Sequence, residues 1–461
     1  MNGTHKCCRH GRDSCRTARH AAYPDRARGL SRTPGIGALL SVQCLGTFND
    51  NLLKTVVSLM AAEAALTGRG SSSLLPLSGI AFVAPYVLLA GYAGFVADRF
   101  DKRNVIVVAK AAELLVMALA ILALMAGWIE ALVAILFLVS IQATFVSPAK
   151  YGLLPEALAT SALSRANGLM EVSRYGAVIL GTASGGLALS VWRSHPDRIG
   201  ALLLTIATLS LMASLFVRRS RRAGLARSFR LNPWSDIGVG MRRLSADPRL
   251  SFAVAGLTCF DFVCTLVMLD MILIGKTRMR IDDWHIGVLG TVVGLGAGIG
   301  SIAAGRLSRG RIEPTLAFAG YVGIGAALLG LAIAVNAYLA TAAVFMLLGV
   351  FAGMVIVPLN AMLQATARAG EKGLVIATNN FLNMMGAALA SGCLWLLHDI
   401  WNISPNVILV CGSALAFSFV LYGARRRPQL ATRGLARWLI SVRKHRARRP
   451  LAMDGCHSGN S

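Results

Sequence analysis

Long apolar runs recur along the whole chain, and they set the expected architecture. Each run is about 20 residues long, enough for an α-helix to cross a hydrocarbon core about 30 Å thick. No ten-residue alternation of apolar and polar positions is visible, so helices rather than barrel strands are expected to pair the backbone polar groups. The expected spans are 36–61, 74–97, 104–126, 131–150, 165–190, 199–217, 250–274, 284–305, 314–335, 338–362, 376–397 and 405–423.

The composition agrees with this pattern. Of the 461 residues, 55% are hydrophobic and only 15% are charged. That balance is far too apolar for a soluble protein of this size. We therefore expect an all-α membrane protein with twelve transmembrane helices.

The net charge of +25 is concentrated outside the apolar runs. Residues 1–34, 218–249 and 425–461 hold 8, 9 and 10 Lys and Arg against 2, 2 and 1 Asp and Glu. With twelve spans these three segments lie on one side, and the positive-inside rule makes that side cytoplasmic. Basic segments beside membrane helices are usually topology signals that touch anionic lipid headgroups. A nucleic-acid partner is not expected, because no fold for base recognition is present.

Motifs for enzyme chemistry are missing or accidental. The N-terminal HKCCRHGRDSC lacks the paired spacing of a zinc site. His20 and Asp25 form the His-x4-Asp pattern of acyltransferases by chance, in an arm expected to be disordered. The run GLGAGIGS fails the G-x-G-x-x-G spacing, and Gly290, Gly294 and Gly298 predict close helix packing instead. We expect no catalytic residue, no metal and no cofactor.

An internal repeat divides the chain into two halves of six runs each. GFVADRFDKR follows the second run and SIAAGRLSRGR follows the eighth; Pro148 and Lys150 in the fourth run correspond to Pro358 and Asn360 in the tenth. Two related halves place a substrate site at their interface. The expected parts are a disordered basic cytoplasmic arm (1–34), an N-terminal six-helix bundle (35–217), a basic cytoplasmic linker (218–249), a C-terminal six-helix bundle (250–423) and a basic cytoplasmic tail (424–461).

Several polar residues lie inside the apolar runs, where charges are costly and usually functional. In the first run Asp50 and Lys54 stand at positions i and i+4, so an internal ion pair is the alternative to a direct role. The candidate substrate-binding or coupling residues are Asn49, Asp50, Asn51, Lys54, Glu171, Asp261, Asn360 and Asn380.

A candidate gate lies in the turn after the second run. An acidic residue beside basic ones can hold one half against the other through ion pairs and helix-end dipoles, and release it in another state. A solvated turn that obeys the positive-inside rule is the alternative. The candidate gating residues are Asp98, Arg99, Lys102, Arg103 and, at the end of the fourth run, Lys150.

The motif SPAKYGLLPE followed by RANGLMEVS resembles the lysophospholipid transporter family of the major facilitator superfamily, as do FNDNLLK, ADRFDKR and VPLNAMLQ. The resemblance implies the 6+6 pseudo-twofold fold and a flippase that moves lysophospholipids from the outer to the inner leaflet of a bacterial inner membrane by alternating access. It implies headgroup or switching roles for Asp50, Lys150 and Glu171. One departure is Met268, which lies in the seventh run where a basic residue is expected.

Two other functions stay open at this point. A proton-coupled exporter of amphiphilic drugs would use Asp50 or Asp261 as the proton-carrying acid. A membrane scaffold would recruit a cytoplasmic acyltransferase through the basic tail. The expected partners are therefore a lysophospholipid substrate, membrane lipids and a cytoplasmic acyltransferase, with both chain termini in the cytoplasm.

Overall fold

The computed structural model describes residues 35–66, 74–219, 232–334 and 337–426, and all regular elements in these ranges are helical. The expected arm 1–34 and nearly all of the expected tail 424–461 lie outside the described residues. The helices are α2 (Ile36–Leu66), α3 (Leu74–Leu88), α4 (Ala90–Arg99), α5 (Lys102–Ala126), α6 (Ile129–Ala157), α7 (Thr160–Val191), α8 (Pro196–Leu215), α9 (Pro233–Ala246), α10 (Pro248–Thr277), α11 (Asp283–Leu307), α12 (Pro314–Ala334), α13 (Tyr338–Thr366), α14 (Lys372–Trp395), η2 (Leu396–Ile400) and α15 (Pro405–Arg426).

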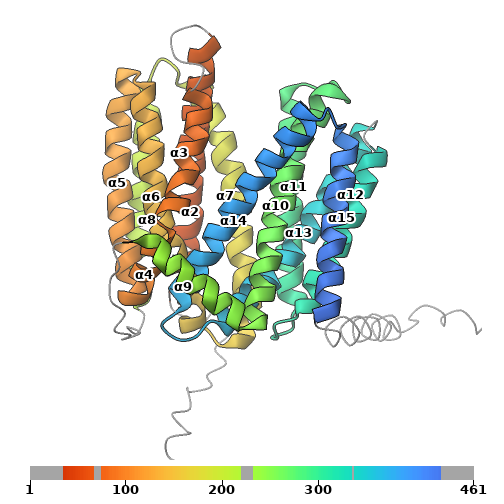
Figure 1. Ribbon diagram of the computed structural model, residues 1–461. Helices are drawn as coiled ribbons and strands as arrows, with labels where there is room; N and C mark the ends of the chain where they lie inside the picture. The colour runs from red at the N-terminus through yellow and green to blue at the C-terminus, as the bar shows by residue number, and fades with distance from the viewer. Residues whose placement is uncertain (1–34, 67–73, 220–231, 335–336, 427–461) are drawn as a thin grey trace, which may run out of the picture.

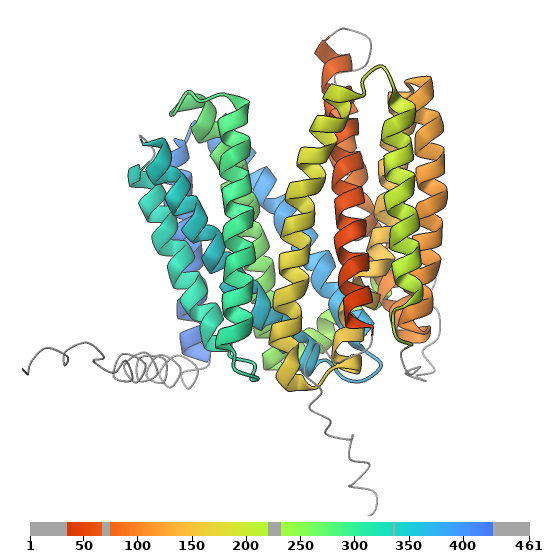
Figure 2. The same ribbon diagram turned by 180° about the vertical axis from the view of Figure 1, so that it is seen from behind.

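The helices form two bundles that stand side by side (Figures 1 and 2). Helices α2 to α8 make up the first bundle, and α10 to α15 make up the second. Helices α7 and α14 lie between them: α7 packs on α2 in its own bundle and on α11 in the other, while α14 packs on α10 and on α4. This is the arrangement that the internal repeat predicts, although the domain boundaries themselves stay predictions.

Each of the twelve expected spans corresponds to a helix or a helix pair in the described part of the chain. Within that part, nine helices are long and apolar enough to cross a membrane, and the pair α3–α4, bent by 50°, makes a tenth. Helices α2 and α7 are 31 and 32 residues long. We assign them as spans as well, because their polar residues line the central cavity described below and lower their mean hydropathy.

Helix α9 lies within the linker, where only a basic segment was expected. Asn232 caps its first turn by accepting a hydrogen bond from the Trp234 amide at 3.0 Å. Ile237, Gly240 and Leu244 are buried at helical spacing, so α9 is amphipathic. It slants across the lower part of the molecule in Figure 1 and contacts both α4 and α14. The linker therefore bridges the two bundles on one side of the molecule.

The glycines of α11 pack differently from the expectation. A Cβ added at Gly296 or Gly300 would lie 2.3 and 2.0 Å from carbonyl oxygens of α13, so these two residues permit the close contact. A Cβ at Gly298 would meet nothing within 4 Å. The prediction of close packing holds for Gly294, where a Cβ would lie 2.8 Å from Ile179 of α7, and is wrong for Gly290 and Gly298, because α13 lies on the neighbouring face of α11.

Candidate functional site

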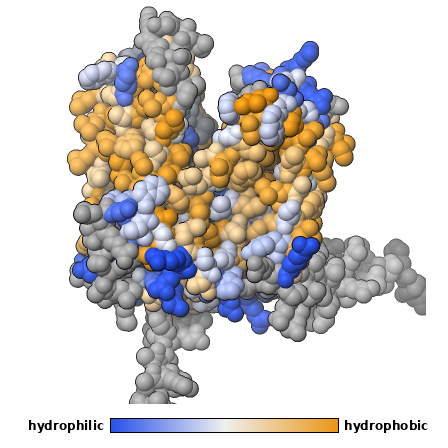
Figure 3. All heavy atoms as spheres, in the orientation of Figure 1, coloured by the Kyte–Doolittle hydropathy of each residue, from blue (hydrophilic) through white to orange (hydrophobic). Residues whose placement is uncertain are grey.

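A cavity of about 380 Å³ lies between the two bundles, and both contribute to its walls. The space-filling view shows a notch between the bundles on the side opposite α9 (Figure 3). The polar residues that line the cavity come from α2, α3, α5, α6 and α7 in the first bundle and from α10, α13 and α14 in the second. The charged lining residues are Asp50, Lys110, Lys150, Glu171, Arg174 and Asp261.

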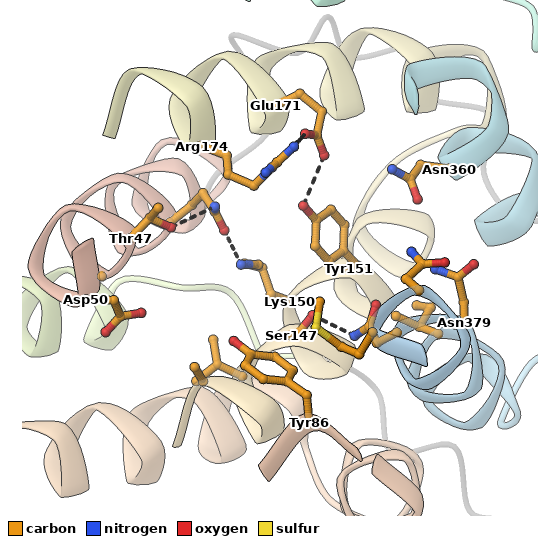
Figure 4. A pocket seen from close by; sticks show the side chains of 18 of the residues that line it. Thr47, Asp50, Tyr86, Ser147, Lys150, Tyr151, Glu171, Arg174, Asn360 and Asn379 are labelled. Atoms are coloured by element: carbon orange, nitrogen blue, oxygen red, sulfur yellow. Dashed lines mark hydrogen bonds and ion pairs between the residues drawn. The ribbon is translucent and has the colours of Figure 1, made fainter. Parts of the chain in front are cut away.

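Lys150 projects from α6 into this cavity (Figure 4). Its ammonium group donates a hydrogen bond to the side-chain oxygen of Gln43 on α2 and lies 5.1 Å from the centre of the Tyr151 ring. Among the described residues no carboxylate forms an ion pair with it. The sequence placed Lys150 at the gate, whereas the structure places it in the cavity wall with a neutral partner.

Glu171 and Arg174 form a compensated pair on α7. Arg174 Nη2 lies 2.7 Å from Glu171 Oε2, and its Nε donates to the same oxygen at 2.8 Å. The Tyr151 hydroxyl donates to Glu171 Oε1 at 3.2 Å (Figure 4). The Arg174 guanidinium lies 4.2 Å from the centre of the Tyr175 ring. Both carboxylate oxygens of Glu171 are thus occupied, and its charge is balanced locally.

Asp50 and Lys54 do not form the ion pair that their spacing allows. Lys54 lies over the Phe82 ring, 4.4 Å from its centre. Asp50 lines the cavity, and its buried Oδ1 has no hydrogen-bond partner within the described ranges. Asp50 is therefore an acidic group held in the cavity wall, while the ammonium of Lys54 is stabilised by an aromatic face.

The two asparagines beside Asp50 have structural partners. Asn49 is buried and donates to Glu113 Oε1 at 3.2 Å, and Lys110 forms an ion pair with the same carboxylate. Asn51 donates to the Thr47 carbonyl within α2 at 2.7 Å and also lines the cavity. Of the candidates in this motif, Asn49 therefore supports the pair of Glu113 with the cavity-lining Lys110, and Asn51 lies at the cavity surface.

The second bundle supplies mainly amides to the cavity. Asn380 donates to the Ser147 hydroxyl of the first bundle at 2.9 Å. Asn167 and Gln364 exchange two hydrogen bonds of 2.8 Å across the bundle interface. The other polar lining residues from this bundle are Asp261, Asn360, Asn379 and Asn383. The structure therefore brings Asn360, Asn380 and Asp261 into one cavity with Lys150 and Glu171.

The predicted gating turn contacts the other bundle on the side of α9. Asp98 is buried, and its two carboxylate oxygens accept hydrogen bonds from the Gly373 and Leu374 amides at 2.6 and 2.9 Å. These amides belong to the first turn of α14, where the helix dipole favours a negative charge. Asp98 thus joins α4 to α14, which is the kind of contact that a releasable latch requires.

The basic residues of the turn act within the first bundle. Lys102 is buried and pairs with Glu156 at 2.7 Å, and Arg103 donates to the Leu215 carbonyl at 2.7 Å. Arg99 is exposed. On the other side of the latch, Arg243 of α9 pairs with a carboxylate next to the start of α14, Glu371, at 2.9 Å. The turn is therefore anchored to α6 and α8, and Asp98 reaches across to α14.

Sequence reasoning missed Gln43 and Thr47, which form the polar surface of α2 together with Asp50. A signal was available, because positions 43, 47, 50 and 54 follow helical spacing and mark one face. The partnership of Gln43 with Lys150 had no such signal, since it depends on how α2 and α6 pack. Within the described ranges, no cluster of three or more His, Cys, Asp or Glu is placed to hold a metal ion.

The fold and the cavity define a multi-pass membrane transporter with two related bundles around a polar centre. The family model of the Major Facilitator Superfamily matches residues 39–391. The chain is 30% identical to the lysophospholipid transporter LplT of Enterobacter sp. (strain 638) over 336 residues, which is 72% of this chain and 80% of that protein. The chain belongs to the lysophospholipid transporter family of the Major Facilitator Superfamily.

Two solved structures have the same fold. The human organic anion transporter MFSD10 aligns with a TM-score of 0.68 at 17% identity, over 84% of this chain and 99% of that chain. The transporter FucP in its outward conformation also gives a TM-score of 0.68, at 15% identity over 84% of this chain and 98% of that chain. At these identities the likeness shows the fold alone, and it confirms the fold class predicted from the sequence.

Proposed function

We propose that this protein is a flippase that moves lysophospholipids from the outer to the inner leaflet of the bacterial inner membrane by alternating access. The observation that carries the proposal is Lys150. It is a cation in the wall of a membrane-embedded cavity, and its hydrogen-bond partner, Gln43, is neutral. A lipid phosphate would supply the missing negative charge through a charge-assisted hydrogen bond. The name of the Enterobacter relative supports the same substrate class.

The cavity suits the physical problem of flipping a lipid. A charged headgroup crosses hydrocarbon slowly, because it must give up its hydration. The amides of the second bundle and the charges of the first provide a polar route between the bundles. In alternating access, rocking of one bundle against the other exposes such a site to each side in turn.

The described conformation corresponds to an outward-open state in this proposal. The two bundles are joined on the side of α9, where Asp98 caps α14 and Asn167 pairs with Gln364. That side carries the basic linker, so the positive-inside rule makes it cytoplasmic. The notch on the opposite side faces the outer leaflet (Figure 3). Transport then requires the Asp98 contact to break.

The test is flipping by the purified protein in proteoliposomes. Radiolabelled lysophosphatidylethanolamine or lysophosphatidylglycerol is supplied to the outer leaflet, and albumin extraction measures what remains accessible. We expect protein-dependent loss of accessible lysolipid in the absence of a proton gradient. Flipping no faster than in protein-free vesicles would overturn the proposal.

The same assay separates the flippase from the proton-coupled exporter. One observation favours the exporter: the buried Oδ1 of Asp50 has no hydrogen-bond partner in the part of the chain that the structure describes. An exporter that uses Asp50 as its proton carrier would require an imposed proton gradient and would move amphiphilic drugs. If transport depends on that gradient and lysolipids are not moved, the exporter replaces the flippase.

A further inference from the structure

A second cavity, of about 240 Å³, adjoins the central one inside the C-terminal bundle. It lies among α7, α10, α11, α12 and α13, and we refer to it as the apolar chamber. Val178 of α7 and Phe260 of α10 line both cavities, so the two spaces meet at these side chains. The polar centre of the protein therefore continues sideways into a second compartment.

The walls of the chamber are almost entirely apolar. The polar side-chain atoms among its lining residues are the hydroxyls of Tyr175 and Tyr321 and the thiol of Cys264. The Tyr321 hydroxyl already donates to the Gly256 carbonyl. Apolar cavities of this kind are dry and take apolar ligands. A charged headgroup cannot be satisfied there, whereas a hydrocarbon chain can.

Helix α11 leaves this space open at Gly290. A Cβ added at Gly290 would meet only the terminal methyl of Met271, at 3.7 Å, and one at Gly294 would meet the end of Ile179, at 2.8 Å. Contact with α13 depends instead on Gly296 and Gly300. Gly290 thus contributes room in the chamber, whereas Gly294 allows Ile179 of α7 to pack closely against α11.

The boundary between the compartments separates charge from hydrocarbon. Arg174 covers one face of the Tyr175 ring on the side of the polar cavity, and Tyr175 also lines the chamber. On α10, Asp261 lines the polar cavity and Met268 lines the chamber. Met268 stands in the span where a basic residue was expected, and its place in the chamber wall accounts for an apolar side chain there.

We propose that the apolar chamber binds the single acyl chain of the substrate while its phosphate lies at Lys150. The inference rests on the proposed function and deepens it, because it names the part of the protein that binds the acyl chain of the lysolipid. Scaled from the roughly 150 Å³ cavity that holds one benzene, the chamber has room for roughly ten carbons. That volume fits one chain and excludes a second, so a diacyl lipid is rejected here.

The test is a chain-length series in the flipping assay. Unlabelled 1-acyl lysophosphatidylethanolamines from hexanoyl to octadecanoyl compete with the labelled substrate. In the wild type, apparent affinity should rise by about fourfold per methylene and level off at about ten carbons. Diacyl phosphatidylethanolamine should compete poorly at every length.

Variants of the chamber should move the plateau in opposite directions. Gly290→Leu adds four carbons to the chamber wall, so the plateau should fall by roughly four carbons while hexanoyl competition stays unchanged. Met268→Ala removes side-chain volume, so the plateau should move to longer chains. The matched control is Gly298→Leu on the same helix, outside both cavities, where a Cβ meets nothing within 4 Å; it should behave like the wild type.

The outcomes separate this inference from the proposed function. If the wild type flips lysolipids but both chamber variants keep its chain-length profile, the chamber is not the chain site and the flippase proposal stands. Equal competition by diacyl lipid would also overturn the single-chain assignment. If the wild type flips no lysolipid at all, the proposed function itself fails. Should Gly290→Leu fail to fold, Met268→Ala still decides the question.

Discussion

The two bundles contribute different chemistry to equivalent places in the cavity. Pro148 and Lys150 of the first bundle correspond to Pro358 and Asn360 of the second, so a cation in one half faces an amide in the other. The first bundle also supplies the compensated pair of Glu171 and Arg174. The second supplies amides on α13 and α14 and encloses most of the apolar chamber.

This difference shows how a repeated scaffold becomes asymmetric. The repeat fixes where helices bend and which turns face the centre, but it does not require the same side chains there. Burying a second cation in the other half would cost desolvation that an amide avoids, since an amide needs only hydrogen-bond partners. A substrate with one charged end and one apolar end matches such a divided interior, because each end meets one bundle.

Removing the cation should produce the largest effect. Lys150→Ala should slow lysolipid flipping by about 30-fold or more, because truncating a buried charged partner typically costs about 2 kcal/mol or more. Lys150→Arg should retain part of the activity, and Asn360→Ala, at the equivalent position, should lose less than Lys150→Ala. Initial flipping rates in proteoliposomes provide the measurement. Equal losses at positions 150 and 360 would contradict the asymmetry.

A double exchange sharpens the same comparison. Lys150→Asn combined with Asn360→Lys moves the cation into the other bundle without changing composition. We expect this variant to remain defective, because Gln43 and the Tyr151 ring hold the ammonium only at position 150. Recovery to wild-type rates would show that either bundle can hold the phosphate.

Neutralising the latch should have an intermediate effect. Asp98→Asn removes the charge at the start of α14 while keeping a similar shape, and hydrogen bonds to charged groups contribute about 1.5–3 kcal/mol. The closed cytoplasmic side should therefore open at least about tenfold more often. Spin–spin distances across the cytoplasmic ends of α4 and α14 report this population. Arg99→Ala, at the exposed neighbour, is the matched control, and an unchanged distance distribution in Asp98→Asn would reject the latch.

The pair on α9 should matter least. The side chains of Arg243 and Glu371 are 43% and 22% exposed, so solvent screens their attraction. Arg243→Ala should destabilise the closed side by less than about 1 kcal/mol. The same distance measurement on Arg243→Ala, Glu371→Gln and the double variant gives their coupling. A shift as large as that of Asp98→Asn would mean that α9, rather than the turn, holds the bundles together.

The sequence predicted the helices and the repeat because both depend on patterns within one segment. Apolar runs located the helices to within a few residues, except where a helix continues past its apolar run, as α6 continues to Ala157 and α13 to Thr366. Asp98 was found because an acidic residue in a basic turn has no role in topology. Each of these features can be recognised within one short segment of the sequence.

What the sequence did not predict depends on packing between segments. Lys150 stands near the end of its apolar run, so only the position of α2 shows that it faces the cavity with Gln43 as partner. The spacing of Gly290, Gly294 and Gly298 marks a face of α11 but not which helix lies against it. Helix α9 was not predicted, because its basic residues were interpreted only as a topology signal. The sequence did contain its N-cap, Asn232, and the helical spacing of Ile237, Gly240 and Leu244.

The contact between Asp98 and α14 also has a consequence for how the protein can change over generations. On one side the contact depends on a carboxylate that a single substitution removes; on the other it depends on backbone amides, which every residue except proline provides. Gly373 is further constrained, since a Cβ there would lie 2.7 Å from the Gly94 carbonyl oxygen. Inherited variation that tunes the cytoplasmic closure should therefore act through Asp98, whereas the amides of α14 persist under most substitutions, except proline at either position and any side chain at Gly373.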